Sequence, residues 1–98
     1  MVRADLLAWH EDGSVTVLEA KRACDQYGIA MATGQVLLYE QLLLDLEGAT
    51  SVNKVVVIDG ALYPAAFRMN ERLGLGIRFV VAHHGGYAEA ELRYGAQG

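Results

Sequence analysis

Two strand-like runs lie near the start of the chain: ADLLAWH at residues 4–10, and SVTVLEAK at residues 14–21, in which hydrophobic and polar residues alternate. Alternation with a period of two is typical of strands that have one buried face. The runs are separated by Glu11-Asp12-Gly13, in which the glycine can take the left-handed conformation of a three-residue hairpin loop. The pattern therefore predicts a β-hairpin over residues 4–21.

The middle of the chain predicts a long helix. The stretch at residues 22–34 is polar and contains glycines, which predicts a connection with at most a short helical turn. Residues 35–48, QVLLYEQLLLDLEG, place leucine on nearly every face of a helix that Gly48 would end. A helix that is apolar all round is buried on more than one side. We therefore expect it to pack on the sheet and also against another helix or subunit.

The second half of the chain predicts three more strands and one more helix. The runs NKVVVID at 53–59 and IRFVVAHH at 77–84 are typical of central strands that are covered on both faces. Residues 60–74 predict a helix with a proline in its first turn and a glycine just past its end. Residues 87–95 alternate as a half-exposed strand does. The predicted order is β-β-α-β-α-β-β, an α/β fold with a mixed central sheet and flanking helices.

Composition narrows the classes of protein to which this fold can belong. The 98 residues predict a single domain, residues 1–98, and a hydrophobic fraction of 53% predicts that a homodimer or a partner protein covers part of its surface. No apolar run reaches the ~18 residues that cross a bilayer, and acids occur too early for a signal peptide, so we expect a cytoplasmic protein. A net charge of −4 means that any contact with nucleic acid is local.

The charged residues of the hairpin form the main candidate site. A three-residue loop makes paired positions sum to 24, so Asp5 lies opposite Glu19, and Lys21 points to the same face two residues later. Opposed carboxylates repel each other, and a divalent cation such as Mg²⁺ or Mn²⁺ removes the repulsion. A lysine beside the cation can orient an attacking water or stabilise charge on a phosphate. This arrangement predicts metal-assisted hydrolysis of phosphodiesters.

The hairpin RADLLAWHEDGSVTVLEAK resembles the active-site hairpin of the PD-(D/E)XK nuclease superfamily, which has the restriction-endonuclease-like fold. In that family an aspartate opens one strand and a Glu-x-Lys closes the next, and Asp5 and Glu19-Ala20-Lys21 match these positions. The following helix of RecB-like members carries a Q-x-x-x-Y signature, which Gln35 and Tyr39 match. The motifs cover the first half of the chain, and the later β-α-β follows the family by element order.

The resemblance implies a metal-dependent endonuclease or exonuclease that hydrolyses phosphodiester bonds in DNA. It assigns binding of Mg²⁺ or Mn²⁺ to Asp5, Glu19 and the backbone carbonyl of Ala20. It assigns positioning of the attacking water to Lys21, with the glutamine and tyrosine of the helix assisting. A homodimer would present two such sites to the two strands of DNA.

Two departures from the family pattern keep a second hypothesis open. Ala4 stands where the family usually has proline, and the four residues before Asp5 are too few for the helix and strand that open the family core. We therefore expect the N-terminal family helix to be absent, or to come from another subunit. The alternative is a non-catalytic subunit of nuclease fold that docks on a partner protein, in which Glu19 and Lys21 are an ordinary surface ion pair.

Other polar and aromatic residues predict no site. His83 and His84 would face opposite sides of a strand and not converge on one ion. Trp9 is expected in the core. The basic residues outside the hairpin motif are expected on the solvated surface rather than in a patch that binds DNA; they are Arg22, Lys54, Arg68, Arg72 and Arg78.

Overall fold

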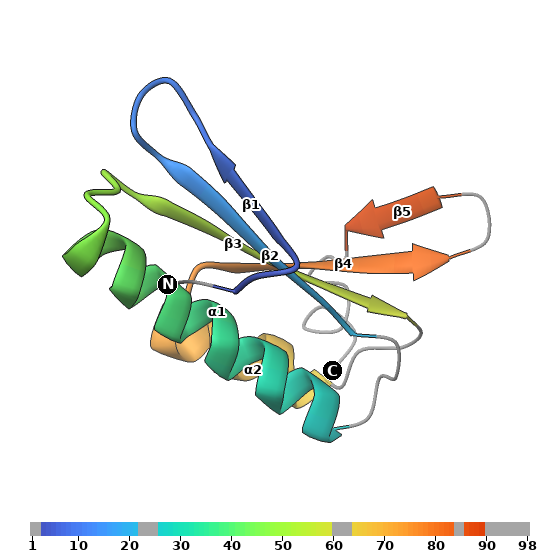
Figure 1. The fold of residues 1–98 in the computed structure, drawn as a ribbon. Helices are drawn as coiled ribbons and strands as arrows, with labels where there is room; N and C mark the ends of the chain where they lie inside the picture. The colour runs from blue at the N-terminus through green and yellow to red at the C-terminus, as the bar shows by residue number, and fades with distance from the viewer. Residues whose placement is uncertain (1–2, 22–25, 60–63, 84–85, 90–98) are drawn as a thin grey trace.

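A computed structural model describes residues 3–21, 26–59, 64–83 and 86–89 (Figure 1). The elements are β1 (Leu6–Trp9), β2 (Val15–Lys21), α1 (Gln26–Leu46), β3 (Val52–Asp59), α2 (Pro64–Leu73), β4 (Ile77–His83) and β5 (Gly86–Glu89). The molecule is thus a small α/β domain, and its order β-β-α-β-α-β confirms the prediction. The last predicted strand is seen over its first residues as β5, and residues 90–95 lie outside the described part.

The sheet is mixed, and its strands lie side by side in sequence order. The pairs β2–β3 and β3–β4 are parallel, whereas β1 pairs with β2 and β5 pairs with β4 in the antiparallel direction. The connections from β2 to β3 and from β3 to β4 step across the sheet in the same direction, so two crossovers of the usual right hand place both helices on one face. Figure 1 shows α1 and α2 on the same side of the sheet.

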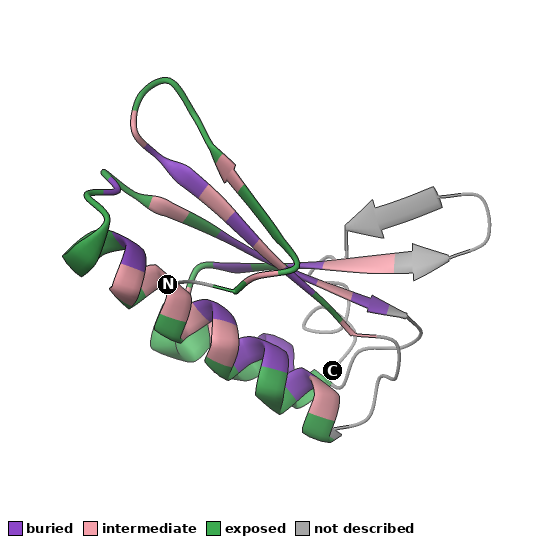
Figure 2. Ribbon diagram, viewed as in Figure 1, coloured by how far each residue is buried: buried purple, intermediate pink, exposed green. Residues whose placement is uncertain are grey.

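The core lies between this face and the two helices. Apolar side chains at alternate positions of the strands form one buried cluster with side chains of α1 and α2. Figure 2 shows the buried residues along these strands and helices. The most completely buried side chains are Val15, Val17, Val36, Leu43, Val56 and Ile58. The prediction that helices cover β3 and β4 on both faces is wrong for the described residues, because both helices lie on one. On the opposite face Val55 is nearly buried by its neighbours, while Val57 and Val80 are half-buried.

Helix α1 begins nine residues before the predicted start, at Gln26 instead of Gln35. Its added turns contain two glycines, Gly28 and Gly34, and a glycine inside a helix costs about 1 kcal/mol relative to alanine. Burial of Ile29 and Ala32 against the sheet outweighs that cost. The predicted end is confirmed, since Gly48 has a φ of 76°. Neither helix of the described residues is both long and apolar enough to cross a membrane.

The hairpin has the predicted register. Leu6 pairs with Leu18 and Leu7 with Val17, so paired positions sum to 24. The loop is closed by a hydrogen bond from the His10 amide to the Ser14 carbonyl, at 2.9 Å, and the glycine at position 13 has a φ of 86°. The prediction for Trp9 is wrong: this residue is 47% exposed, because α1 packs on β2 and β3 and leaves the short edge strand β1 largely uncovered.

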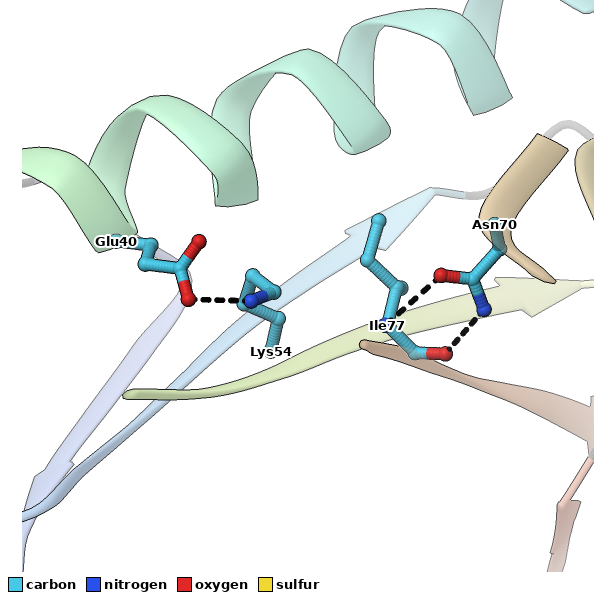
Figure 3. Close-up of polar contacts among 4 residues, drawn as sticks. All are labelled: Glu40, Lys54, Asn70 and Ile77. Carbon is cyan, nitrogen blue, oxygen red and sulfur yellow. Dashed lines mark hydrogen bonds and ion pairs between the residues drawn. The ribbon is translucent and has the colours of Figure 1, made fainter. Parts of the chain in front are cut away.

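Two polar contacts fix the helices to the sheet (Figure 3). The side-chain amide of Asn70 on α2 donates to the Ile77 carbonyl at 2.7 Å and accepts from the Ile77 amide at 3.0 Å. Lys54, buried on the helix-facing side of β3, forms an ion pair with Glu40 of α1. The ion pair places the charged Lys54 side chain in the core, next to α1. The same helix carries Gln35 and Tyr39 of the main candidate site.

Candidate functional site

Asp5 and Glu19 lie opposite each other, one step beyond the last paired residues of the hairpin. His10 and Ser14 form a hydrogen-bonded pair, and such pairs alternate with non-hydrogen-bonded ones along an antiparallel ladder. Counting from the loop, the Asp5–Glu19 position is a non-hydrogen-bonded one, where opposed side chains come closest. The Asp5 carboxylate accepts the Ala20 amide at 2.8 Å, which holds it at this end of β1.

The Glu19 carboxyl is buried on the helix-facing side of β2, with 3% of the residue exposed. Its Oε1 atom has no hydrogen-bond partner among the described residues. Burial raises the pKa of Glu19, the nearby charge of Asp5 raises it further, and the charge of Lys21 opposes the shift. A buried carboxylate with an unpaired oxygen is costly. The site is therefore stabilised by whatever neutralises this group, either a proton or a cation.

Tyr39 of α1 lies near the carboxylates of Asp5 and Glu19, whose charges act on its hydroxyl. Its hydroxyl donates a hydrogen bond of 3.1 Å to the Arg3 carbonyl, which joins α1 to the segment that precedes β1. Burial raises the pKa of the Tyr39 phenol, and the charges of Glu19 and Asp5 raise it further. The hydroxyl thus lies within electrostatic range of both acids, and the raised pKa favours the neutral form that donates the hydrogen bond.

Gln35 and Lys21 are the remaining predicted site residues. Gln35 is half-buried, one turn before Tyr39 on the same side of α1, and its Oε1 atom has no hydrogen-bond partner among the described residues. Lys21 is half-buried at the end of β2, close enough for its charge to lower the pKa of Glu19. Asp5 and Lys21 thus act on Glu19, both acids act on Tyr39, and Gln35 has an unpaired side-chain oxygen one turn earlier on the helix.

The donor set fits a hard divalent cation. The residues that the structure describes contain no group of three histidine, cysteine or acidic side chains placed to hold a metal. The side-chain ligands that this site can offer are the two carboxylates of Asp5 and Glu19. The Ala20 amide donates to Asp5, on the side of β1. In an antiparallel pair, the amide and the carbonyl of one residue point to the same neighbouring strand. The Ala20 carbonyl thus lies on the Asp5 side. Mg²⁺ and Mn²⁺ accept few protein oxygens and complete their shell with water.

The buried Lys54–Glu40 pair was not expected from the sequence. The sequence predicts Lys54 among the scattered basic residues of the surface, and this prediction is wrong. Lys54 is buried and paired with Glu40, so it is not available to a nucleic acid. The sequence signal that could have revealed this pair is a lysine inside an otherwise β-branched central strand, together with an acid on the helix that precedes this strand. Arg22 and His84 lie outside the described residues, as does the side chain of His83.

Comparison of this chain with protein-family models, with curated proteins and with solved structures gives no significant match. Its function is therefore inferred from the geometry of the Asp5–Glu19 pair, from the residues that surround this pair and from the order of the motifs along the chain.

Proposed function

We propose that this chain is a metal-dependent nuclease of the PD-(D/E)XK type, with a restriction-endonuclease-like fold, that hydrolyses phosphodiester bonds in DNA in the cytoplasm. The observation that carries the proposal is the buried Glu19 carboxylate, which has an unpaired oxygen and lies opposite Asp5. Opposed carboxylates at a position of closest approach destabilise a hairpin. A site that binds a cation has a reason to keep them.

Each polar group has a role in such a site. Asp5, Glu19 and the Ala20 carbonyl would hold Mg²⁺ or Mn²⁺. When bound, the cation supplies charge stabilisation at the phosphate and lowers the pKa of a coordinated water. Lys21, on the same face as Glu19, orients the attacking water and stabilises negative charge that develops on the phosphate.

The two helix residues support the site from the side. Tyr39 holds the segment before β1 in place through the Arg3 carbonyl, and so positions Asp5 two residues later. Gln35, with its unpaired side-chain oxygen, supplies an amide that binds either the water or a phosphate oxygen.

A non-catalytic interaction subunit is the second candidate, and the outer face of α1 favours it. Tyr27, Met31 and Leu38 are each more than half exposed on this face. In this candidate Asp5 and Glu19 share a proton, which the raised pKa of Glu19 permits, and bind no metal. The two candidates therefore differ in whether the folded chain binds a divalent cation.

The deciding experiment combines calorimetry with a cleavage assay. Titration with Mn²⁺ is expected to show binding to the wild type and to Lys21→Ala, and a loss of at least tenfold in affinity for Glu19→Gln. Cleavage of supercoiled plasmid and of single-stranded DNA in Mg²⁺ is expected to fall by about a hundredfold or more in Lys21→Ala, because one group that stabilises developing charge is lost.

The matched control is Glu11→Gln, which removes an exposed acid from the hairpin loop and is expected to change neither result. A folded wild-type chain that binds no Mn²⁺ contradicts the proposal and favours the interaction subunit. Cleavage that persists in Lys21→Ala removes the role assigned to this lysine.

A further inference from the structure

The outer face of α1 carries a regular row of side chains that we call the outer stripe: Tyr27, Met31, Gly34, Leu38, Gln41 and Asp45. The spacing alternates between four and three residues, which is the repeat of a helix that packs along another helix. The stripe lies opposite the side whose residues Ile29, Val36 and Leu43 pack on the sheet.

The first two thirds of the outer stripe are unusually apolar for exposed helix surface. Tyr27 is 73% exposed, and Met31 and Leu38 are each 58% exposed. Residues 26–39 contain no charged side chain at all. An exposed helix of a monomer ordinarily carries polar residues on this side. The described residues include no element that covers it.

Gly34 leaves open space on the outer stripe for a neighbouring chain. It lies inside α1 with negative φ, and a Cβ atom added to it would meet nothing within 4 Å. Nothing in the described part of the fold thus requires glycine here, although glycine costs about 1 kcal/mol relative to alanine inside a helix. Absence of a side chain at an exposed helical position is useful where a neighbouring chain comes near.

We propose that the outer stripe is the interface of a homodimer in which the two α1 helices pack antiparallel about a two-fold axis. Positions whose numbers sum to 65 then face each other. Met31 of one copy meets Gly34 of the other, so that a long side chain fills the space that the glycine leaves. Tyr27 of one copy meets Leu38 of the other, and both contacts occur twice.

Charge favours the antiparallel orientation of the two copies. Asp45 lies at the C-terminal end of the outer stripe, and the last turn of α1 has no basic residue, so the acid is adverse to the dipole of its own helix. Antiparallel packing in this register keeps the two Asp45 side chains apart and brings together residues 27–38 of the two copies, which carry no charge. Parallel packing would bring Asp45 against Asp45 and leave Gly34 against Gly34.

The small size of the contact between the two outer stripes sets the expected affinity of one copy for the other. Four apolar or small positions per copy cover less than the ~800 Å² per partner of a standard interface. We therefore expect a dissociation constant in the micromolar range. The inference does not depend on nuclease activity, and it holds equally for a chain that binds no metal.

Sedimentation equilibrium of the full chain through the micromolar range tests the interface. Wild type is expected to pass from monomer to dimer, and Leu38→Glu to raise the dissociation constant at least tenfold. Gly34→Gln is expected to raise it as well, while raising the melting temperature of the dilute monomer, because glutamine favours the helix and meets no neighbour. The matched control is Leu73→Glu, which changes an exposed leucine of α2 and leaves dimerisation unchanged.

Disulfide cross-linking tests the orientation, in a chain that also carries Cys24→Ser. Antiparallel packing predicts a covalent dimer for the double variant Tyr27→Cys/Leu38→Cys and none for either single variant. Cross-linking of the single variants overturns the orientation. A wild type that stays monomeric, or that binds only a different protein, overturns the dimer, as does unchanged dimerisation in both Leu38→Glu and Gly34→Gln.

Discussion

Glu19 is an acid in a row of buried valines, and its pKa is set by burial and by the charged neighbours Asp5 and Lys21. The core removes water from the carboxyl, which raises its pKa, and the charge of Asp5 raises it further. Folding therefore makes Glu19 keep its proton to a higher pH than in the unfolded chain. A group whose pKa is raised by folding contributes its full stabilisation below the pKa of the unfolded chain, and this contribution is lost as pH rises through the folded pKa.

This shift predicts how stability depends on pH at the scale of one residue. In the presence of a chelator, the free energy of unfolding of the wild type should fall, relative to that of Glu19→Gln, as pH rises through and above the carboxyl range. Urea unfolding at a series of pH values measures the difference. Mn²⁺ at neutral pH should restore the stability of the wild type but not of the variant, because a bound cation replaces the proton.

Glu11→Gln serves again as the control, since the loop carboxyl is exposed and its loss should leave this pH dependence unchanged. Parallel curves for wild type and Glu19→Gln would show that the carboxyl is not perturbed by the fold, and would remove the electrostatic basis of the candidate metal site.

At the scale of elements, α1 is held on β3 by one buried charged contact as well as by apolar packing. Lys54 has a 7% exposed side chain, and its partner Glu40 has a 28% exposed one. The two groups therefore differ in what happens when the other is removed. A carboxylate at the edge of the core can be hydrated after a small movement, whereas an ammonium group inside it cannot.

The asymmetry gives a prediction for a matched pair of variants. Glu40→Met leaves a buried, unpaired ammonium and should cost about 3 kcal/mol. Lys54→Met should cost less than about 1 kcal/mol, because a methionine fills the apolar space and the acid turns to solvent. Denaturant unfolding of the two variants measures both values. Equal losses would mean that the pair stabilises through packing rather than through the burial of one charge.

The elements also indicate how much structure can be predicted from the sequence. The hairpin register followed from one glycine and the alternation of the flanking runs, because a three-residue loop leaves a single pairing. The start of α1 did not follow, because Gly34 and the polar residues near it favour a loop locally. Packing of Ile29 and Ala32 on the sheet decides that start, and local propensity contains no information about such a contact.

The candidate site shows the same division. Asp5 opposite Glu19 was predictable, since the register alone fixes it. The burial of Glu19 was not predictable, because its neighbours Ala20 and Lys21 are typical of the exposed end of a strand. The ion pair of Lys54 was missed for the converse reason: charge predicts exposure on average, and only the three-dimensional contact with Glu40 makes burial of a lysine tolerable.

At the scale of the whole molecule, the described sheet has a covered face and an open one. Both helices lie on the same side, so neighbouring residues of a central strand meet different surroundings. Val56 on β3 points to the helices and is fully buried, whereas Val57 points the other way and is half-buried. The sequence of β3 does not distinguish them, because both lie in one uninterrupted run of valines.

The same substitution at these two adjacent positions tests the one-sided arrangement. Val56→Thr places a hydroxyl among apolar groups and should cost about 1–3 kcal/mol. Val57→Thr lets the hydroxyl reach water, keeps the β-branched shape that a strand favours, and should cost less than about 0.5 kcal/mol. Urea unfolding below the concentration at which copies associate gives both values for the monomer. Equal costs would mean that the second face is covered too, by part of the chain or by another molecule, and the sheet would then be a central layer between two others.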